Sequence, residues 1–140
     1  MFSAIKNPED FNLPSDYTND GVYTNNLFYK IYYTSLNYGD AKAQCESDGA
    51  FLAIPRSNAE NDFIVSLIPN EHIWIGVNDI KIENSFVADD GCPLRYTNWI
   101  HDQPDDYQGL EHVVIIHSHH KKWNDVTLGF RAKFVCSKSV

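Results

Sequence analysis

Residues 96–112 read YTNWIHDQPDDYQGLEH, and this stretch says more about the fold than any other part of the chain. Four of its last twelve residues are carboxylates, and they surround Pro104. A solvated loop tolerates such charge, but it does not need a central proline or the final Glu111. Crowded carboxylates repel one another unless a cation lies among them, and oxygen-rich loops suit calcium. The stretch therefore suggests a metal site in an irregular loop.

Working outward from this loop, several segments read as strands. LFYKIYY (27–33) is aromatic and β-branched, and HIWIGV (72–77) reads as a buried strand. After the loop, residues 113–116, 121–125 and 131–136 read as an antiparallel set of strands. From Asn78 to Glu111 the sequence contains Gly, Pro, Asn and Asp throughout, which is unusually long for a loop unless a metal organises it.

Two helices are predicted between the first two strands. Asn37 offers an N-cap, and Gly49 ends a short helix that carries Cys45 on its apolar face. Ser57 and Glu60 form a capping-box pattern before a second helix, which ends at Pro69. The predicted fold class is therefore α+β.

Length and charge limit the possible functions. The chain has 140 residues and 43% hydrophobic residues, which predicts one domain with a real core. Residues 1–26 are polar and read as an N-terminal arm, which leaves residues 27–140 as the domain. The formal net charge of −8 argues against nucleic acid and anionic lipid as partners. No apolar run is long enough to span a membrane.

Four stretches, taken together and in order, carry a family resemblance. They are DAKAQC followed by GAFLAI (40–54), WIGV (74–77), YTNWIHDQPDD (96–106), and WND (123–125) followed by FVC. From about Leu27 to Cys136 the chain resembles a C-type lectin domain. The resemblance implies a C-type lectin fold, with two helices, small antiparallel sheets and a long calcium-binding loop.

The resemblance also implies how the cysteines are used. Cys45 and Cys136 would form a disulfide between the first helix and the last strand. The positions of the family's second disulfide fall on Val113 and Leu128, and an apolar pair there is expected to fill the space by packing. Cys92 has no family counterpart, and it is either a free, partly buried thiol or the link of a disulfide-bonded dimer.

The resemblance places the main calcium site in the loop and on the strand after it. Its ligands would be Gln103, Asp105, Glu111, Asn124 and Asp125, all of which carry side-chain oxygens. Pro104 would follow a cis peptide bond. A solvated acidic turn is the alternative, but it leaves WND and Glu111 unexplained.

An accessory calcium site is suggested as well. Asp79, Glu83 and Asp106 match the family's ligand positions, with Glu111 shared between the sites. His112 stands where the family often has an aspartate, and calcium prefers oxygen to imidazole. We expect a protonated His112 to weaken calcium binding at mildly acidic pH.

The order of side chains around Pro104 suggests a sugar preference. A calcium-bound sugar hydroxyl also needs hydrogen-bond partners among the metal ligands. Gln103 places an amide donor first and Asp105 places a carboxylate third, an order that in this family goes with galactose and N-acetylgalactosamine. Tyr107 stands where galactose binders often carry tryptophan, so it is expected to stack on the sugar. An ordinary exposed loop tyrosine is the alternative.

Other constellations point elsewhere. His117, His119 and His120 form either an exposed hairpin turn, which the spacing favours, or a zinc site. No nucleophile motif or P-loop is present, and an acid–base role for Asp105 and Asp106 conflicts with calcium ligation, so no enzyme is expected. The tryptophans (Trp74, Trp99 and Trp123) are expected to pack in the core or under the loop.

These observations predict a calcium-dependent lectin for galactose-terminated glycans. A single site would be weak, so several copies would have to act together, joined through Cys92 or residues 1–26. Residues 1–10 show no apolar signal segment, so an extracellular location rests on the family and on the supply of calcium. The alternative function is a module of the same fold that binds a protein or an ice surface.

Overall fold

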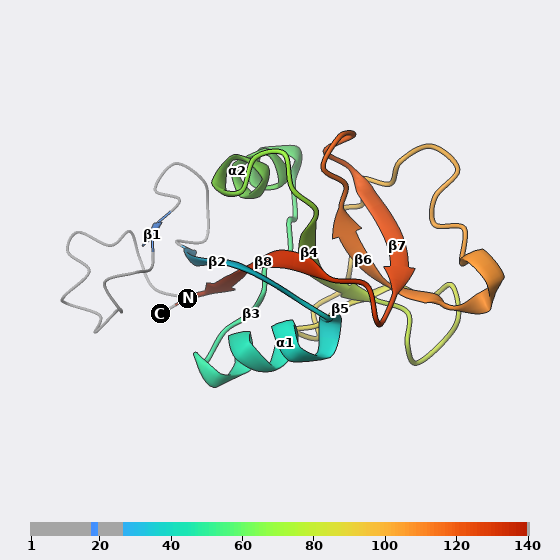
Figure 1. Ribbon diagram of the computed structural model, residues 1–140, viewed down its shortest axis with the longest axis horizontal. Helices are drawn as coiled ribbons and strands as arrows, with labels where there is room; N and C mark the ends of the chain where they lie inside the picture. The colour runs from blue at the N-terminus through green and yellow to red at the C-terminus, as the bar shows by residue number, and fades with distance from the viewer. Residues whose placement is uncertain (1–17, 20–26, 140) are drawn as a thin grey trace.

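The computed structural model describes residues 18–19 and 27–139. In this part of the chain two helices and one eight-stranded mixed sheet form, so the predicted α+β class is confirmed (Figure 1). The sheet order is β1-β2-β8-β4-β6-β7, with β3 added to β8 and β5 added to β4. The elements are β1 Thr18–Asn19, β2 Phe28–Leu36, α1 Tyr38–Ser47, β3 Phe51–Leu52, α2 Asn58–Leu67, β4 Ile73–Asn78, β5 Val87–Ala88, η2 Tyr107–Gly109, β6 Glu111–Ile116, β7 Trp123–Thr127 and β8 Ala132–Lys138.

Local capping explains where both helices begin. The Asn37 side chain accepts the Asp40 amide hydrogen at 2.9 Å, and the Ser57 hydroxyl accepts that of Glu60 at 3.1 Å. Both caps were predicted. The Glu60 carboxylate reaches back to the amide of Arg56 at 2.9 Å, one residue beyond the usual capping-box partner. These contacts satisfy amide groups that would otherwise have no partner in the first turn.

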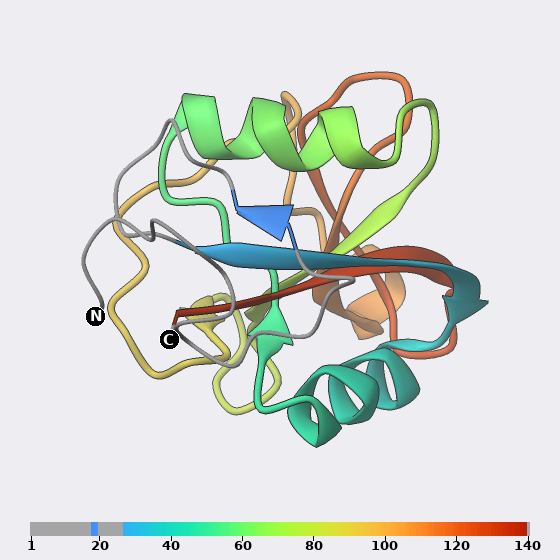
Figure 2. The same ribbon diagram turned by 90° about the vertical axis from the view of Figure 1, so that its left-hand side faces the viewer.

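The helices lie on opposite faces of the sheet and so create two cores (Figures 1 and 2). On the α2 face, Ile64 belongs to a cluster that also contains Ile75 and Trp123. On the α1 face, Ala41 belongs to a cluster with Trp74. Strand β4 supplies both clusters because successive residues of a strand point to opposite faces. The expected burial of Trp74 and Trp123 is confirmed, and both are 0% exposed.

The predicted strand arrangement was wrong in one respect. The last strand does not join β6 and β7 in a purely antiparallel set. Instead β8 lies between β2, to which it is antiparallel, and β4, to which it is parallel through Ile73–Lys133 and Trp74–Phe134. The sheet is consequently mixed, and β8 packs at the centre with both faces covered.

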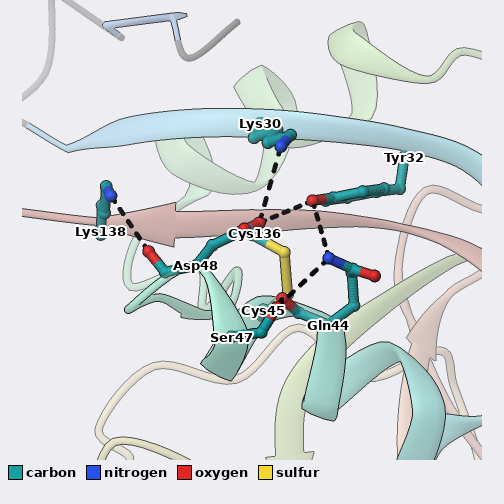
Figure 3. The surroundings of a disulfide bond; sticks show 8 residues. All are labelled: Lys30, Tyr32, Gln44, Cys45, Ser47, Asp48, Cys136 and Lys138. Atoms are coloured by element: carbon teal, nitrogen blue, oxygen red, sulfur yellow. Dashed lines mark hydrogen bonds and ion pairs between the residues drawn. A yellow bond between two sulfur atoms is a disulfide. The ribbon is translucent and has the colours of Figure 1, made fainter. Parts of the chain in front are cut away.

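The disulfide between Cys45 and Cys136 is present, with the two Cα atoms 5.3 Å apart. It ties α1 to β8, and both cysteines are fully buried. Polar contacts surround it (Figure 3): the Tyr32 hydroxyl donates to Asp48 at 2.6 Å, and the Lys138 ammonium donates to the Asp48 carbonyl at 3.1 Å. Helix α1 is thus fixed to the sheet by covalent and polar links together.

Two expectations about the remaining disulfide positions need correction. Cys92 forms no disulfide within the chain, and it is exposed rather than partly buried. Val113 and Leu128 do not pack as a pair, because Val113 is fully buried while Leu128 is 48% exposed. The register of β6 and β7 places Val126 opposite Val113, so Val126 takes the expected packing role.

Two predictions concern the chain ends and the membrane. Most of the predicted arm, residues 1–17 and 20–26, lies outside the described residues, although Thr18 and Asn19 pair with β2. Within the described residues, neither helix has the length and apolar character needed to cross a bilayer.

Candidate functional site

The long segment between β4 and β6 is anchored at its start by a partly buried polar network. The Asp89 carboxylate accepts the Tyr38 hydroxyl at 2.7 Å and the Asn78 side-chain amide at 2.7 Å. The Asn78 side-chain oxygen accepts the backbone amide hydrogen of Ile80 at 3.1 Å. Burial raises the pKa of Asp89, and the hydrogen bonds from its two partners lower it in part. The network joins α1, the end of β4 and the start of the loop.

The middle of the loop is held by aromatic packing and backbone bonds. Trp99 packs edge-on against Trp123 and Phe86, with ring centroids 5.5 and 4.9 Å apart. The Trp123 amide donates to the Asn98 carbonyl at 2.8 Å, and the Ile100 amide donates to the Trp123 carbonyl at 2.9 Å. The loop-packing role expected of Trp99 is confirmed. These contacts bring residues 101–106 beside β7.

Three carboxylates of the predicted main site meet at that point. Asp105, Glu111 and Asp125 each offer an oxygen atom, and the three oxygens lie within 4.8 Å of one another. Asp105 comes from the loop, Glu111 begins β6 and Asp125 lies in β7. The peptide bond between Gln103 and Pro104 is cis, as expected.

Asp125 positions the backbone of the loop as well as supplying a carboxylate. Its two side-chain oxygens accept the amide hydrogens of Asp105 at 3.1 Å and Asp106 at 2.8 Å. Asp125 is fully buried, and burial raises its pKa, while the two amide hydrogen bonds lower it in part. Sequence reasoning assigned Asp125 to the metal alone and missed this second role.

The carboxylates of Asp105 and Glu111 form a hydrogen-bonded pair whose pKa values are shifted in opposite directions. Partial burial and then the hydrogen bond with Asp105 raise the pKa of Glu111 to about 7. The same hydrogen bond lowers the pKa of Asp105. The Tyr107 amide also donates to the Glu111 carboxylate at 3.1 Å. A cation among these oxygens would relieve the repulsion between the carboxylates and favour their ionised forms.

Gln103 gives the clearest indication of a ligand. Its side-chain oxygen is buried and has no hydrogen-bond partner in the described structure. A buried carbonyl oxygen without a partner is costly, so a position of this kind calls for an explanation such as an ion. With three carboxylates nearby, the donor set is made of oxygen atoms only and fits calcium.

A second group of possible ligands corresponds to the predicted accessory site. The His112 imidazole lies 3.1 Å from the buried Asp79 carboxylate and 3.4 Å from that of Glu83. Burial alone would lower the pKa of His112, but the hydrogen bond and charge of Asp79, with Glu83 and Asp106, raise it overall. The neighbouring carboxylates therefore favour the protonated, positively charged form of the imidazole.

The remaining predicted residues lie around these two groups. The Asp106 carboxylate accepts the Glu111 amide hydrogen at 3.1 Å and hydrogen bonds to Glu83, so Asp106 lies between the groups. Tyr107 is 63% exposed in η2 and so is available to a ligand. Asn124 precedes Asp125 in β7 and is partly buried.

The histidines near 117–120 form a turn, as the spacing favoured. His72 joins them, with its ring 4.7 Å from that of His117. The His72 Nδ1 atom accepts the Ser118 amide hydrogen, and the His117 Nδ1 atom accepts that of His119, both at 3.1 Å. A neutral imidazole has one ring nitrogen with a free lone pair, so in His72 and His117 these bonds occupy the atoms that zinc would need.

Comparison with known proteins matches the chain to the family described as Lectin C-type domain over residues 34–138. Collectin-10 of Xenopus tropicalis is 36% identical over 118 residues, which cover 81% of this chain and 42% of collectin-10. The chain therefore spans less than half of the length of this relative.

Solved structures share the fold. The C-type carbohydrate-recognition domain of cow CD23, determined in the presence of a GlcNAc2Man3 oligosaccharide, matches with a TM-score of 0.81 and 27% identity over 92% of this chain and 97% of that domain. A calcium-independent type II antifreeze protein matches with a TM-score of 0.81 and 23% identity over 91% of this chain and 94% of that protein. At this identity the second match concerns the fold alone.

Proposed function

The chain belongs to the lectin C-type domain family, and on this premise we propose that it is a calcium-dependent carbohydrate-binding module that prefers terminal galactose or N-acetylgalactosamine. One observation supports the proposal above the others. The oxygens of Asp105, Glu111 and Asp125 converge, and the buried Gln103 oxygen beside them has no partner. In this arrangement a hard cation would satisfy four oxygens at once.

The residues assigned to calcium are Gln103, Asp105, Glu111, Asn124 and Asp125. When bound, calcium supplies coordination positions that two vicinal sugar hydroxyls can fill. The protein must then satisfy the hydrogen-bonding groups of those hydroxyls. The Gln103 amide offers a donor, and the Asp105 carboxylate offers an acceptor. In the C-type lectin family this order of donor and acceptor goes with galactose, and this supports the proposed preference.

Tyr107 is the proposed apolar contact for the sugar. It lies in η2, and the amide hydrogen of this residue is bonded to the proposed ligand Glu111. A ring in this place can pack on the C–H face of galactose, the flatter and more apolar side of the sugar. The accessory site is proposed at Asp79, Glu83 and Asp106, with His112 as a competing cation.

Binding rather than catalysis is proposed, and the setting is proposed to be extracellular, where millimolar calcium fills a weak site. Glycans or glycoconjugates with exposed galactose are the proposed partners. Because one monosaccharide site is weak, we propose that several copies act together, through the exposed Cys92 or residues 1–26.

Affinity chromatography tests the proposal. The protein is applied in calcium to immobilised galactose and to immobilised mannose, and EDTA follows. Retention on galactose alone, with release by EDTA, is the expected result. Retention on mannose resin would support a lectin function but contradict the proposed preference for galactose. If neither resin retains a calcium-loaded protein, the alternative, a protein- or ice-binding module of this fold, takes its place.

A further inference from the structure

Exposed apolar side chains gather around the candidate site. Eight large apolar residues are exposed in the described part of the chain, and five of them come from the segments that carry the proposed ligands. We call these five the apolar rim: Ile80, Ile82, Tyr107, Leu110 and Leu128. Exposed apolar side chains that are concentrated in the segments of one site usually mark a surface that contacts a partner.

Contacts of neighbouring residues place the rim beside both ligand groups. Ile80 and Ile82 lie between Asp79 and Glu83, whose carboxylates both contact His112. Leu110 precedes Glu111 and Leu128 follows Thr127, and Glu111 and Thr127 are register partners in β6 and β7. In Figure 1 the yellow-green segment after β4 and the orange segment before β6 lie together at the end of the molecule opposite β1.

The negative charge of the segments around the site limits which kinds of partner can bind there. The same segments hold many carboxylates, and Lys81 is their one lysine. The carboxylates are Asp79, Glu83, Asp102, Asp105, Asp106, Glu111 and Asp125. Calcium ions at the two groups would neutralise only part of this charge. The face therefore repels anionic lipid and suits an apolar partner without net charge.

We propose that the apolar rim contacts the bilayer around a membrane-borne glycan, so that the chain binds neutral glycolipids in preference to galactose held away from a membrane. This inference rests on the proposed function, because the glycan must occupy the calcium site. With the sugar bound at the centre, its hydrophobic carrier lies next to the rim. Ile80, Ile82 and Leu110 then enter the apolar region beneath the headgroups.

The test compares two kinds of phosphatidylcholine vesicle in calcium. One carries lactosylceramide, and the other carries galactose at the same density on a lipid with a long polyethylene glycol spacer. The wild-type protein is expected to bind the lactosylceramide vesicles about tenfold more tightly, as burial of two half-exposed isoleucines implies. Replacing part of the phosphatidylcholine with phosphatidylserine is expected to weaken binding.

Variants identify the residues. Ile80→Ser with Ile82→Ser is expected to reduce lactosylceramide binding to the level of the spacer vesicles and leave retention on galactose resin unchanged. Tyr33→Ser with Phe51→Ser is the matched control, because these exposed apolar residues lie on β2 and β3, in the other half of the sheet. The control variant is expected to bind as the wild type does.

A direct probe of insertion is the Ile82→Trp variant with brominated phosphatidylcholine. We expect quenching of its fluorescence on lactosylceramide vesicles but not on spacer vesicles. Equal binding to both vesicles, no quenching, or stronger binding with phosphatidylserine would overturn the inference. So would rim-dependent self-association of the protein in free solution. If the wild type binds neither vesicle nor galactose resin, the proposed function itself fails.

Discussion

The carboxylate of Asp125 in β7 accepts the backbone amide hydrogen of Asp106 at 2.8 Å, although the two residues are 19 positions apart in the chain. Its other oxygen accepts the amide of Asp105. A buried side chain in a regular strand therefore fixes the backbone of the irregular loop. The loop is partly organised before any ligand binds, which reduces the ordering cost of binding.

Asp125→Asn tests this organisation. The amide group of asparagine would face one backbone donor with a donor of its own, which leaves a buried hydrogen bond unmade. We expect the free energy of unfolding in EDTA to fall by about 1–3 kcal/mol, and calcium binding to be lost. Urea unfolding and calorimetric titration measure the two effects.

Asp102→Asn is the matched control for that variant. Asp102 is in the same loop, but its side chain is 86% exposed and outside both ligand groups. Little change in unfolding or in calcium affinity is expected for it. Equal effects of the two substitutions would mean that loop charge, and not the hydrogen bonds of Asp125, governs both properties.

Calcium affinity is predicted to fall below about pH 7. The pKa of Glu111 is raised to about 7 in the metal-free protein, so a proton competes with calcium at lower pH. From pH 7 to 6 we expect a loss of up to about tenfold, with proton release on binding. Calorimetry in buffers of different ionisation enthalpy measures that release.

Two variants separate the effect of Glu111 titration on calcium affinity from that of His112 titration. Glu111→Gln is expected to bind calcium weakly, with a flatter pH dependence. His112→Ala should retain the Glu111 effect and lose any further decline that occurs as the pH falls through the raised pKa of the His112 imidazole. An unchanged profile in His112→Ala would contradict a role for this imidazole.

The same pKa shift predicts a stability effect in EDTA with the opposite dependence on pH. Because the pKa of Glu111 is raised on folding, its contribution to stability is present below about 4.5 and is lost as pH rises through about 7. Glu111→Gln should lack this loss. Thermal melting of both proteins across that pH range checks the direction, and a parallel decline in both would exclude Glu111 as its source.

Sugar preference should follow the order of groups around Pro104. Gln103→Glu with Asp105→Asn reverses the donor and the acceptor, so retention should move from galactose resin to mannose resin. Tyr107→Ala should weaken galactose binding about fivefold without changing the preference, because only stacking is removed. A double variant that still prefers galactose would show that other residues set the specificity.

The disulfide is predicted to be a major source of stability. Cys45 and Cys136 are separated by 91 positions, and closing a loop of that length contributes about 4–5 kcal/mol in the chain-entropy model. Replacing both with alanine should lower the free energy of unfolding in urea by about that amount. Cys92→Ala is the control, and because this thiol is exposed and unpaired it should leave stability unchanged.

Local chemistry made several features predictable from the sequence alone. In both helix caps the side chain accepts a hydrogen bond from an amide only three residues further along the chain. Asn37 and Ser57 could therefore be identified as caps from the sequence. The loop with the candidate calcium ligands could be recognised in the sequence because Gln103, Asp105 and Glu111 are close in the chain. The resemblance to C-type lectins supplied the pairing of Cys45 with Cys136, since spacing alone does not determine it.

Tertiary structure decided what depends on distant partners. The parallel pairing of β8 with β4, the hydrogen bonds of Asp89 with Tyr38, and the bonds from Asp125 to the loop all join residues far apart in sequence. The exposure of Leu128 likewise depends on how the sheet packs. No periodic pattern signals such pairs, because each forms only when the whole sheet packs and excludes water. The sequence determined which oxygens are available for a ligand, and the packing of the sheet determined that they meet.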